Sequence, residues 1–468
     1  MPEPSSTQSD QNFRESSLQK IDAFLELACC KINRHYATTS GSSDHGGSPV
    51  FTRNGRYVAF AWTEWTRGFQ CGIPLLAYEG TGEEALLNIG KEYTLRYMEP
   101  HLTHHGVHDH GFNTISSFGN LWRLGNSSRL SYQPSPWELK LYEMAIRTSG
   151  AVQASRWQTT ADGFGFVYSF NGPHSLFADT IRSMRVLALA HQLGGCLLGE
   201  QDEKISLLHR LLDHAHTTAL YTVYNGKGRD IYDTEPGRVA HEITFNPVNG
   251  RFRAPSTQQG YSPFSTWTRA LAWIVLGYAE LLEWLVESVG SAWDYPRLSR
   301  EEVLEEFKHT ARICADYYMK YTPVDGIPYW DTAAPGLQRL GEDYIRKPAM
   351  PDNPYEPVDS SAAAIAGQGF LKLARLIPAR RSVYEAYAAR IITTLFSPPY
   401  LAEDPEHEGL ILHAVYHRPN GWDLDPEHQG QVPRHEACLW GDYHALELAV
   451  AAKEEWGAGI PYRFYAAP

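Results

Sequence analysis

Apolar side chains recur every three to four residues along much of the chain, and this spacing predicts amphipathic helices. A typical unit is IPLLAYEGTGEEALLNIGKEYTLRYM, in which two helical stretches flank a Gly-Thr-Gly turn. Glycine accepts the positive φ at the end of a helix, and the acidic residues that follow suit the start of the next one. The pattern predicts twelve helices in six sequential pairs, over residues 15–34, 64–79, 83–99, 110–124, 136–154, 175–194, 203–222, 265–289, 300–320, 359–376, 380–397 and 437–454.

Four connections between these helices are long, at 155–174, 223–264, 321–358 and 398–436. They are rich in Gly, Pro, Asn and aromatic residues, and a few hairpin strands are expected in them. Long ordered loops of this kind are usually functional. Six helical hairpins that close into a ring give an all-α fold, the (α/α)6 barrel, with the loops lining one cavity. We expect one such catalytic domain over 15–468 after a disordered polar N-terminus at 1–14. An open α-solenoid is the alternative, which the divergent repeats disfavour.

Composition narrows the classes of function. The net charge of −13 argues against nucleic acid, since phosphate binding needs a basic face. No apolar run reaches the roughly 18–20 residues that cross a bilayer, and the polar N-terminus has no signal-peptide composition. The six cysteines form no CxxC pair, which indicates reduced thiols and a cytoplasmic protein, although secretion by another route stays open. The 13 Trp, 27 Tyr and 18 Phe are compatible with stacking on sugar rings.

The segment HLTHHGVHDHGF at 101–112 holds five histidines and one aspartate. It superficially resembles the HxHxDH motif of metallo-β-lactamase-type hydrolases, but the spacing differs and a helix follows instead of a strand-to-loop junction. HExxH is absent and no cysteine is near. We therefore expect no functional metal here, only histidines in a polar loop at a helix start.

Two aspartates in the sequence are candidates for acid–base chemistry. Asp109 stands at the start of a helix, where an aspartate is more often an N-cap than a catalyst. Asp179 lies one turn into a strongly apolar predicted helix, amid Phe177, Ala178 and Ile181, where burial would raise its pKa and make it a usable general acid. Further along the chain, Arg269 lies between two tryptophans. It could bind a carboxylate while the rings stack on a pyranose, or it could be a surface arginine beside core tryptophans.

Seven short motifs then occur in order between about residues 60 and 450. They are 65–72 (WTRGFQCG), 108–112 (HDHGF), 178–183 (ADTIRS), 241–250 (HEITFNPVNG), 259–273 (QGYSPFSTWTRALAW), 330–331 (WD) with 359–366 (DSSAAAIA), and 441–447 (GDYHALE). Together they resemble the motifs of the unsaturated glucuronyl hydrolases, glycoside hydrolase family 88. No single motif is decisive, but seven in sequence form a specific signal.

This resemblance implies an (α/α)6 barrel and hydrolysis of an oligosaccharide that ends in a 4,5-unsaturated uronate. Asp179 would protonate carbon 4 and then, as a carboxylate, activate the water that attacks carbon 5. Asp109 would hold the sugar hydroxyls and raise the pKa of its neighbour by like-charge proximity. No metal, nucleotide or other cofactor is implied, and a homodimer is left open. The residues implied to bind the sugar are Trp65, His241, Gln259, Trp267, Arg269 and Trp273. Both aspartates should face one cavity within about 10 Å of each other.

Departures from the family pattern leave the substrate open. Gln70 and Cys71 replace Trp-Pro, Ser183 replaces an asparagine, and Phe170 stands where a tryptophan is expected. One alternative is a conventional inverting glycosidase on a saturated uronide, with carboxyl groups roughly 6.5–9.5 Å apart. Another is a non-catalytic carbohydrate-binding protein, which the retention of both aspartates disfavours. A sugar epimerase would need histidine bases, for which the sequence offers thin support.

Overall fold

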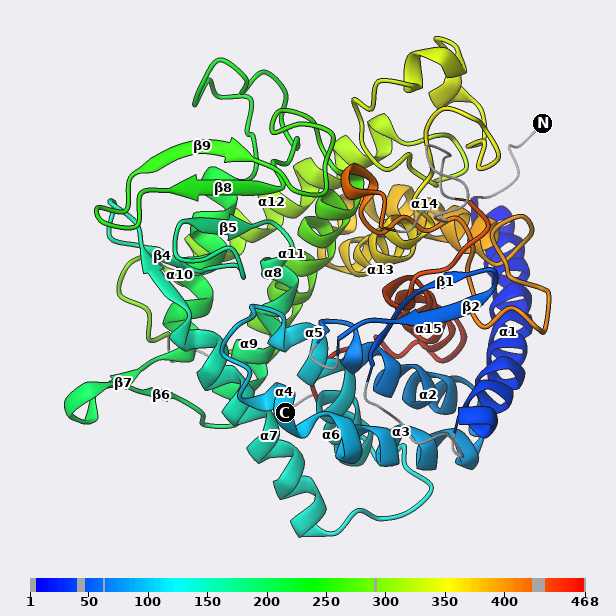
Figure 1. Ribbon diagram of the computed structural model, residues 1–468, viewed down its shortest axis with the longest axis horizontal. Coiled ribbons are helices and arrows are strands. Elements are labelled where there is room, and N and C mark those ends of the chain that lie inside the picture. Colours follow the sequence, from blue (N-terminus) through cyan, green and yellow to red (C-terminus); the bar gives the residue numbers. More distant parts are fainter. Residues whose placement is uncertain (1–5, 40–46, 62–63, 290–292, 423–433, 467–468) are drawn as a thin grey trace.

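The protein folds as an (α/α)6 barrel, two concentric layers of helices around one axis (Figure 1). The computed structural model describes residues 6–39, 47–61, 64–289, 293–422 and 434–466. Among these residues, no helix is long and apolar enough to cross a membrane.

The inner layer is a closed ring. Each of its helices contacts the next, and the last contacts the first. Nearly all side chains of these helices are buried, because most positions on every side of each helix are apolar or small and several of the charged ones form ion pairs inside the protein. The members are α2 (Arg67–Thr81), the run α5 (His110–Thr114), η1 (Ile115–Gly119) and α6 (Asn120–Asn126), the pair α8 (Thr180–Ser183) and α9 (Arg185–Gln192), α11 (Thr268–Ser288), α13 (Ser360–Leu376) and α15 (Leu439–Lys453).

The outer layer packs its apolar stripe on this ring and turns its polar side to solvent. Three of its helices begin at a serine, Ser135, Ser206 or Ser299, whose side chain accepts a hydrogen bond from the first turn. The members are α1 (Ser6–Thr39), α3 (Glu84–Tyr97), α7 (Pro136–Ser155), α10 (Leu207–Tyr221), α12 (Arg300–Tyr321) and α14 (Arg381–Leu395), with the short α4 (Glu99–Leu102) after α3.

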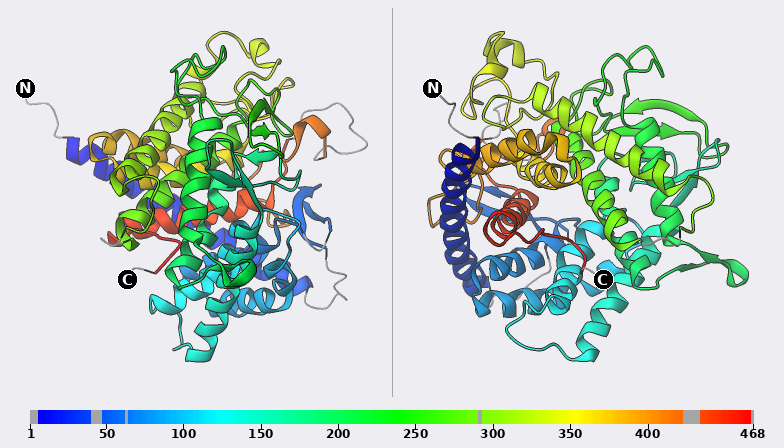
Figure 2. Two further views of the ribbon diagram at one scale, coloured as in Figure 1. Left: turned by 90° about the vertical axis from the view of Figure 1, so that its left-hand side faces the viewer. Right: turned by 180° about the vertical axis from the view of Figure 1, so that it is seen from behind.

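Small antiparallel sheets occur in the connections between the helices. In the left view of Figure 2, the blue hairpin β1–β2 and the orange segment around residue 418 project from the same side of the helices. A three-stranded sheet joins β5 to β8 and β8 to β9, with Leu176 opposite Ile243. The strands are β1 (Pro49–Arg53), β2 (Arg56–Ala59), β3 (Trp157–Thr159), β4 (Gly165–Val167), β5 (Ser175–Phe177), β6 (Leu197–Leu198), β7 (Lys204–Ile205), β8 (Glu242–Phe245) and β9 (Phe252–Ser256).

The predicted pairing of twelve helices is confirmed, and the long connections at 155–174 and 223–264 carry the expected hairpin strands, but two predictions need correction. First, α1 begins at Ser6, within the segment 1–14 for which disorder was predicted. Its first turns have no apolar stripe, so periodicity gave no signal there. Second, residues 175–177 form strand β5 and not the first turn of a helix. Their partner strand lies far away in the sequence, which local periodicity does not register.

Candidate active site

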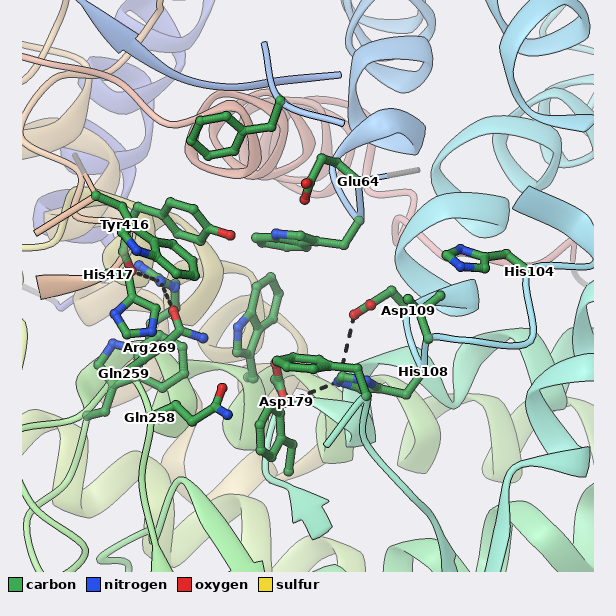
Figure 3. A pocket seen from close by; sticks show the side chains of 18 of the residues that line it. Glu64, His104, His108, Asp109, Asp179, Gln258, Gln259, Arg269, Tyr416 and His417 are labelled. Carbon is green, nitrogen blue, oxygen red and sulfur yellow. Dashed lines mark hydrogen bonds and ion pairs between the residues drawn. The ribbon is translucent and has the colours of Figure 1, made fainter. Parts of the chain in front are cut away.

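A cavity of about 660 Å³ opens at the end of the barrel where the inner helices α2, α5, α8 and α11 begin. The N-terminal ends of these helices therefore face it, and helix dipoles favour negative charge at such a place. Figure 3 shows its polar side chains. The lining residues are Arg53, Phe60, Glu64, Trp65, His104, Val107, His108, Asp109, Phe170, Phe177, Asp179, Gln258, Gln259, Trp267, Arg269, Trp273, Tyr416, His417 and Trp422.

Asp109 and Asp179 occupy the N-cap positions of α5 and α8. Neither side chain makes a capping hydrogen bond, so the ordinary explanation for an aspartate at a helix start does not account for them. Asp109 is buried, the side chain of Asp179 is 14% exposed, and both line the cavity. Their carboxylates are directed toward the space where a ligand would lie.

A single imidazole separates the two carboxylates. The Nε2 atom of His108 lies 3.7 Å from Oδ1 of Asp109 and 4.0 Å from Oδ1 of Asp179 (Figure 3). The two oxygens are therefore at most 7.7 Å apart, the sum of these distances, as the expectation of about 10 Å required. Neither ring nitrogen of His108 has a hydrogen-bond partner among the described residues. The ring of Phe170 lies over that of His108, with centroids 5.9 Å apart.

Burial shifts the protonation of all three groups. It raises the pKa of Asp109 to about 7, against the opposing charge of Arg156. It raises the pKa of Asp179 to about 6, with His108 opposing the shift and the neighbouring Asp109 adding to it. Burial also lowers the pKa of His108 to about 4, so its imidazole is neutral near pH 7. The cavity therefore holds two acids that can carry a proton close to neutral pH.

Close backbone contact brings the two aspartates together. A Cβ atom on Gly111 would lie 2.0 Å from the carbonyl oxygen of Ser183, so only glycine lets α5 and α8 approach this closely. The Ser183 hydroxyl then links the two helix starts. It donates to the His108 carbonyl at 2.8 Å and accepts from the Gly111 amide at 2.9 Å. The serine that departs from the family pattern thus holds the segment that carries Asp109.

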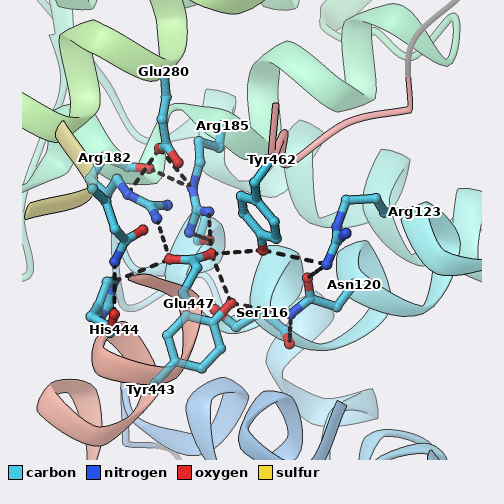
Figure 4. Close-up of polar contacts among 12 residues, drawn as sticks. Ser116, Asn120, Arg123, Arg182, Arg185, Glu280, Tyr443, His444, Glu447 and Tyr462 are labelled. Carbon is cyan, nitrogen blue, oxygen red and sulfur yellow. Dashed lines mark hydrogen bonds and ion pairs between the residues drawn. The ribbon is translucent and has the colours of Figure 1, made fainter. Parts of the chain in front are cut away.

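A buried network of charged side chains links α8 to the neighbouring inner helices (Figure 4). Arg182, one turn beyond Asp179, lies 2.9 Å from Glu280 on α11 and 3.0 Å from Glu447 on α15. Arg185 is near the same two glutamates. Because an unpaired buried charge is costly, the helices that carry these groups are held in one arrangement. Asp179 therefore sits on a firmly anchored helix start.

The guanidinium group of Arg269 makes its hydrogen bonds to other residues of the protein. Its Nη1 atom is 2.9 Å from Asp359 and also bonds the Val415 carbonyl, while Nη2 donates to the Tyr416 carbonyl at 2.7 Å and to Oε1 of Gln259 at 2.9 Å. Both terminal nitrogens, to which the family resemblance gave a substrate carboxylate, already bond to the protein, and Arg269 is not the surface arginine of the alternative interpretation, since it is buried. The bond to Oε1 instead orients Gln259, whose amide nitrogen is left as a donor at the cavity wall.

His241 also differs from its predicted role. Among the described residues, it is not part of the cavity lining. Its Nδ1 atom accepts from the amides of Gln258 and Gln259, at 3.1 and 3.4 Å, and lies 3.2 Å from the Thr257 hydroxyl. The ring packs between Phe177 and Trp267. His241 therefore supports the loop that presents the two glutamines. The other five residues predicted to bind the sugar all line the cavity, namely Trp65, Gln259, Trp267, Arg269 and Trp273.

Several lining residues were missed by sequence reasoning. His108 was treated as part of the surroundings of Asp109, although it lies between the acids. Glu64 is a third acid in the wall, and burial together with the charge of Asp109 raises its pKa. It directly precedes the first of the seven motifs, which was the available signal. Tyr416, His417 and Trp422 come from the long loop at 398–436, which was expected to be functional but contains no motif.

No known family profile matches the chain, but individual proteins do. An unsaturated glucuronyl hydrolase of Formosa agariphila is 25% identical over 390 residues, which cover 82% of this chain and 78% of that protein. An unsaturated chondroitin disaccharide hydrolase of Streptococcus pyogenes is 23% identical over 418 residues, 86% of this chain and 85% of the relative. Both alignments extend across most of the barrel.

The fold is also shared with solved structures. The crystal structure of an unsaturated glucuronyl hydrolase from Bacillus sp. GL1, described as responsible for the degradation of glycosaminoglycan, superposes with a TM-score of 0.69. The match covers 96% of this chain and 99% of that one at 21% sequence identity.

Proposed function

We propose that the chain is a divergent member of the unsaturated glucuronyl hydrolases and removes a 4,5-unsaturated uronate from the non-reducing end of lyase-generated oligosaccharides. The observation that carries the proposal is the pair of buried acids, Asp109 and Asp179, on either side of His108 in one cavity. Burial raises the pKa of both, so each can be protonated near neutral pH.

The reaction begins with protonation of the double bond. Asp179, as the acid, gives its proton to carbon 4, and positive charge develops at carbon 5, where the ring oxygen shares it. Water adds to carbon 5 and loses a proton to the Asp179 carboxylate, which restores the acid. The product is a hemiketal at carbon 5. Its ring opens to a ketone, which leaves a hemiacetal at carbon 1 that expels the rest of the oligosaccharide as an alcohol.

We assign Asp109 to the sugar hydroxyls and to control of its neighbour. Asp109 adds to the raised pKa of Asp179, because ionisation of both acids would place two like charges in one site. His108 stays neutral at pH 7, since burial lowers its pKa to about 4. A neutral ring separates the two carboxylates without neutralising either, which leaves Asp179 able to hold its proton.

The uronate carboxylate is proposed to bind at the wall formed by Gln259 and the helix starts. Arg269 accounts for the orientation of Gln259, because its Nη2 atom donates to Oε1 and leaves the amide N–H groups of Gln259 as donors. His241 holds the backbone of the same loop. Arg269 and His241 are thus positioning residues in this proposal, and Gln259 contacts the substrate.

Aromatic side chains supply the remaining binding surface. Trp65, Trp267 and Trp273 lie deep in the lining, while Phe170 and Trp422 are about half exposed at the mouth. Aromatic faces bury the apolar side of a pyranose and leave its hydroxyls to polar neighbours. We assign the deep tryptophans to the unsaturated ring and the exposed ones to the sugar that leaves.

The proposal is tested with unsaturated disaccharides prepared by lyase digestion. Incubation with the protein should abolish the ultraviolet absorbance of the conjugated double bond and release the second sugar in equal amount. The Asp179→Asn variant is the matched control. Stable absorbance while a saturated uronide is cleaved would overturn the proposal in favour of a conventional glycosidase.

Three further assignments belong to the same proposal. We treat residues 15–468 as one catalytic domain, since every assigned residue lies in the barrel. A cytoplasmic location is proposed from the cysteines, all six of which are free in the structure. A homodimer stays open, and sedimentation of the purified chain measures it directly.

A further inference from the structure

We propose that Asp352, His413 and His435 form a binding site for a divalent transition-metal ion, with zinc as the expected occupant. One ligand atom from each of these residues lies within 4.8 Å of the others. Nε2 of His435 is 3.0 Å from Oδ1 of Asp352. Two ligands of a tetrahedral zinc ion, each about 2.0–2.2 Å from the metal, lie roughly 3.3 Å apart, so this pair is already at coordinating separation.

The third residue, His413, has a buried ring nitrogen without a partner among the described residues. His413 is only 2% exposed, and its Nε2 atom has no hydrogen-bond partner among the described residues. A buried polar atom left unpaired is costly, and a metal ion would satisfy it. Coordination through Nε2 places the ring hydrogen on Nδ1. This ends the contact of Nδ1 with the His435 amide, which at 3.4 Å is too long to oppose metal binding strongly.

The backbone presents these ligands from well-held segments. The side chain of Asn353 donates to the carbonyls of Met350 and Glu356, at 2.6 and 2.7 Å, and so closes the turn that carries Asp352. The carbonyl of His413 accepts from the first amide of α13 at 3.2 Å. The side chains of Asp352 and His435 are 61% and 64% exposed, so they can move the remaining distance toward His413.

Ligand chemistry selects the class of ion. Two imidazoles and one carboxylate suit zinc, copper or nickel, whereas calcium and magnesium prefer all-oxygen sites. Three protein ligands leave the fourth position of a tetrahedral ion to water. The site is unrelated to the histidines at 101–110, for which the sequence predicted no metal.

The position of the site indicates what the ion does. His413 and His435 flank the part of the chain that supplies Tyr416, His417 and Trp422 to the cavity wall. Asp352 belongs to a different loop, between α12 and α13. A bound ion would therefore link the loop that carries Asp352 to the two histidines on either side of that part of the chain. The inference concerns binding and stability, and it does not depend on the proposed reaction.

The experiment is a zinc titration of the full-length protein without a histidine tag, in competition with a chromophoric chelator. One equivalent should bind, and the melting temperature should rise with zinc. The double variant Asp352→Asn/His435→Asn should lose at least tenfold in affinity and lose the rise in melting temperature. Both side chains are exposed, so this variant is expected to fold. His413→Gln gives the same result at the buried ligand.

His105→Asn is the matched control, because His105 is an exposed histidine outside the proposed site. It should bind zinc like the wild type. Cobalt in place of zinc should give the visible absorption of a four-coordinate ion, and the double variant should lose it. Unchanged binding in the double variant, or loss of binding in the control, would overturn the proposal and assign the zinc to the histidines at 101–110.

Discussion

At the scale of single residues, the chemistry depends on the protonation states of three neighbouring side chains. Asp109 and His108 are buried and Asp179 is mostly so, and removal from water favours the neutral form of each. A general acid is most useful when its pKa lies near the working pH. The cavity achieves this for two carboxylic acids at once, because it removes them from water and gives neither an ion-pair partner closer than 3.7 Å.

Replacement of Asp179 by asparagine should abolish most of the activity. The variant keeps the shape of the side chain but has no proton to give. General acid–base help is worth about 10²–10⁴-fold for one transfer, and two transfers depend on this group, so the loss should reach the upper end or exceed it. The loss should fall on kcat, with KM nearly unchanged, in steady-state assays on an unsaturated disaccharide. Turnover close to that of the wild type would contradict the assignment.

The pH dependence of kcat/KM should reflect the protonation of Asp179. Protonated Asp179 starts the reaction and its pKa is raised to about 6, so kcat/KM should fall as pH rises above that value. Asp109→Asn removes the neighbouring acid, whose ionisation opposes that of Asp179, so the pKa of Asp179 should fall. The falling limb should therefore move to lower pH, although the two acids titrate together in the wild type.

Glu64→Gln is the control for this shift, because Asp109 is the neighbouring acid that raises the pKa of Asp179. In Glu64→Gln, the decline of kcat/KM with rising pH should occur at the same pH as in the wild type. A limb that stays in place or moves to higher pH in Asp109→Asn would count against the pairing of the two acids.

Sequence motifs located the residues at the centre of the site better than those at its edge. Asp109 and Asp179 follow from short motifs at helix starts, where position in the fold is nearly fixed by local sequence. The direction of the Arg269 side chain depends on acceptors near residues 359 and 415, far away in the chain, so its full occupation by protein could not be foreseen.

At the scale of elements, the site depends on how closely α5 and α8 approach. Gly111 meets the Ser183 backbone directly, and the two aspartates stand at the ends of the helices that meet there. Helix existence and pairing were predictable, because apolar periodicity is a local property. The switch of residues 175–177 to a strand was not, since its pairing partner is at 242–244.

Gly111→Ala should therefore damage both stability and activity. Its methyl group would lie 2.0 Å from a backbone oxygen, so α5 and α8 must separate. Overpacking of this kind costs about 1–3 kcal/mol, or more where backbone must move. The melting temperature and kcat should both fall. Gly457→Ala, with no atom within 4 Å of the new Cβ, is the control and should leave both unchanged. Full activity in Gly111→Ala would show that this close contact is dispensable.

At the scale of the whole molecule, the buried acids oppose stability. The pKa values of Asp109 and Asp179 are raised to about 7 and 6, above the value near 3.9 in an unfolded chain. Their contribution to folding is therefore fully present below about pH 4 and is lost as pH rises through 6 and 7. Above that range the folded protein holds buried charge.

Asp179→Asn should accordingly stabilise the protein at pH 8, by about 1–3 kcal/mol, and much less at pH 4. Melting temperatures of variant and wild type at the two pH values measure this. Asp343→Asn is the control, because Asp343 is exposed and its bond with Lys347 lowers its pKa, so its removal should give no gain at pH 8. Equal effects of Asp179→Asn at both pH values would mean that its ionisation is not coupled to folding.

The most direct test of the central claim follows one atom through the reaction. In heavy water, proton transfer from Asp179 to carbon 4 of an unsaturated disaccharide must place deuterium at that carbon of the released uronate. The account predicts one deuterium at carbon 4, detected by mass spectrometry and located by NMR, together with loss of the double bond. Cleavage that leaves carbon 4 without solvent deuterium would contradict hydration of the double bond as the chemistry of this barrel.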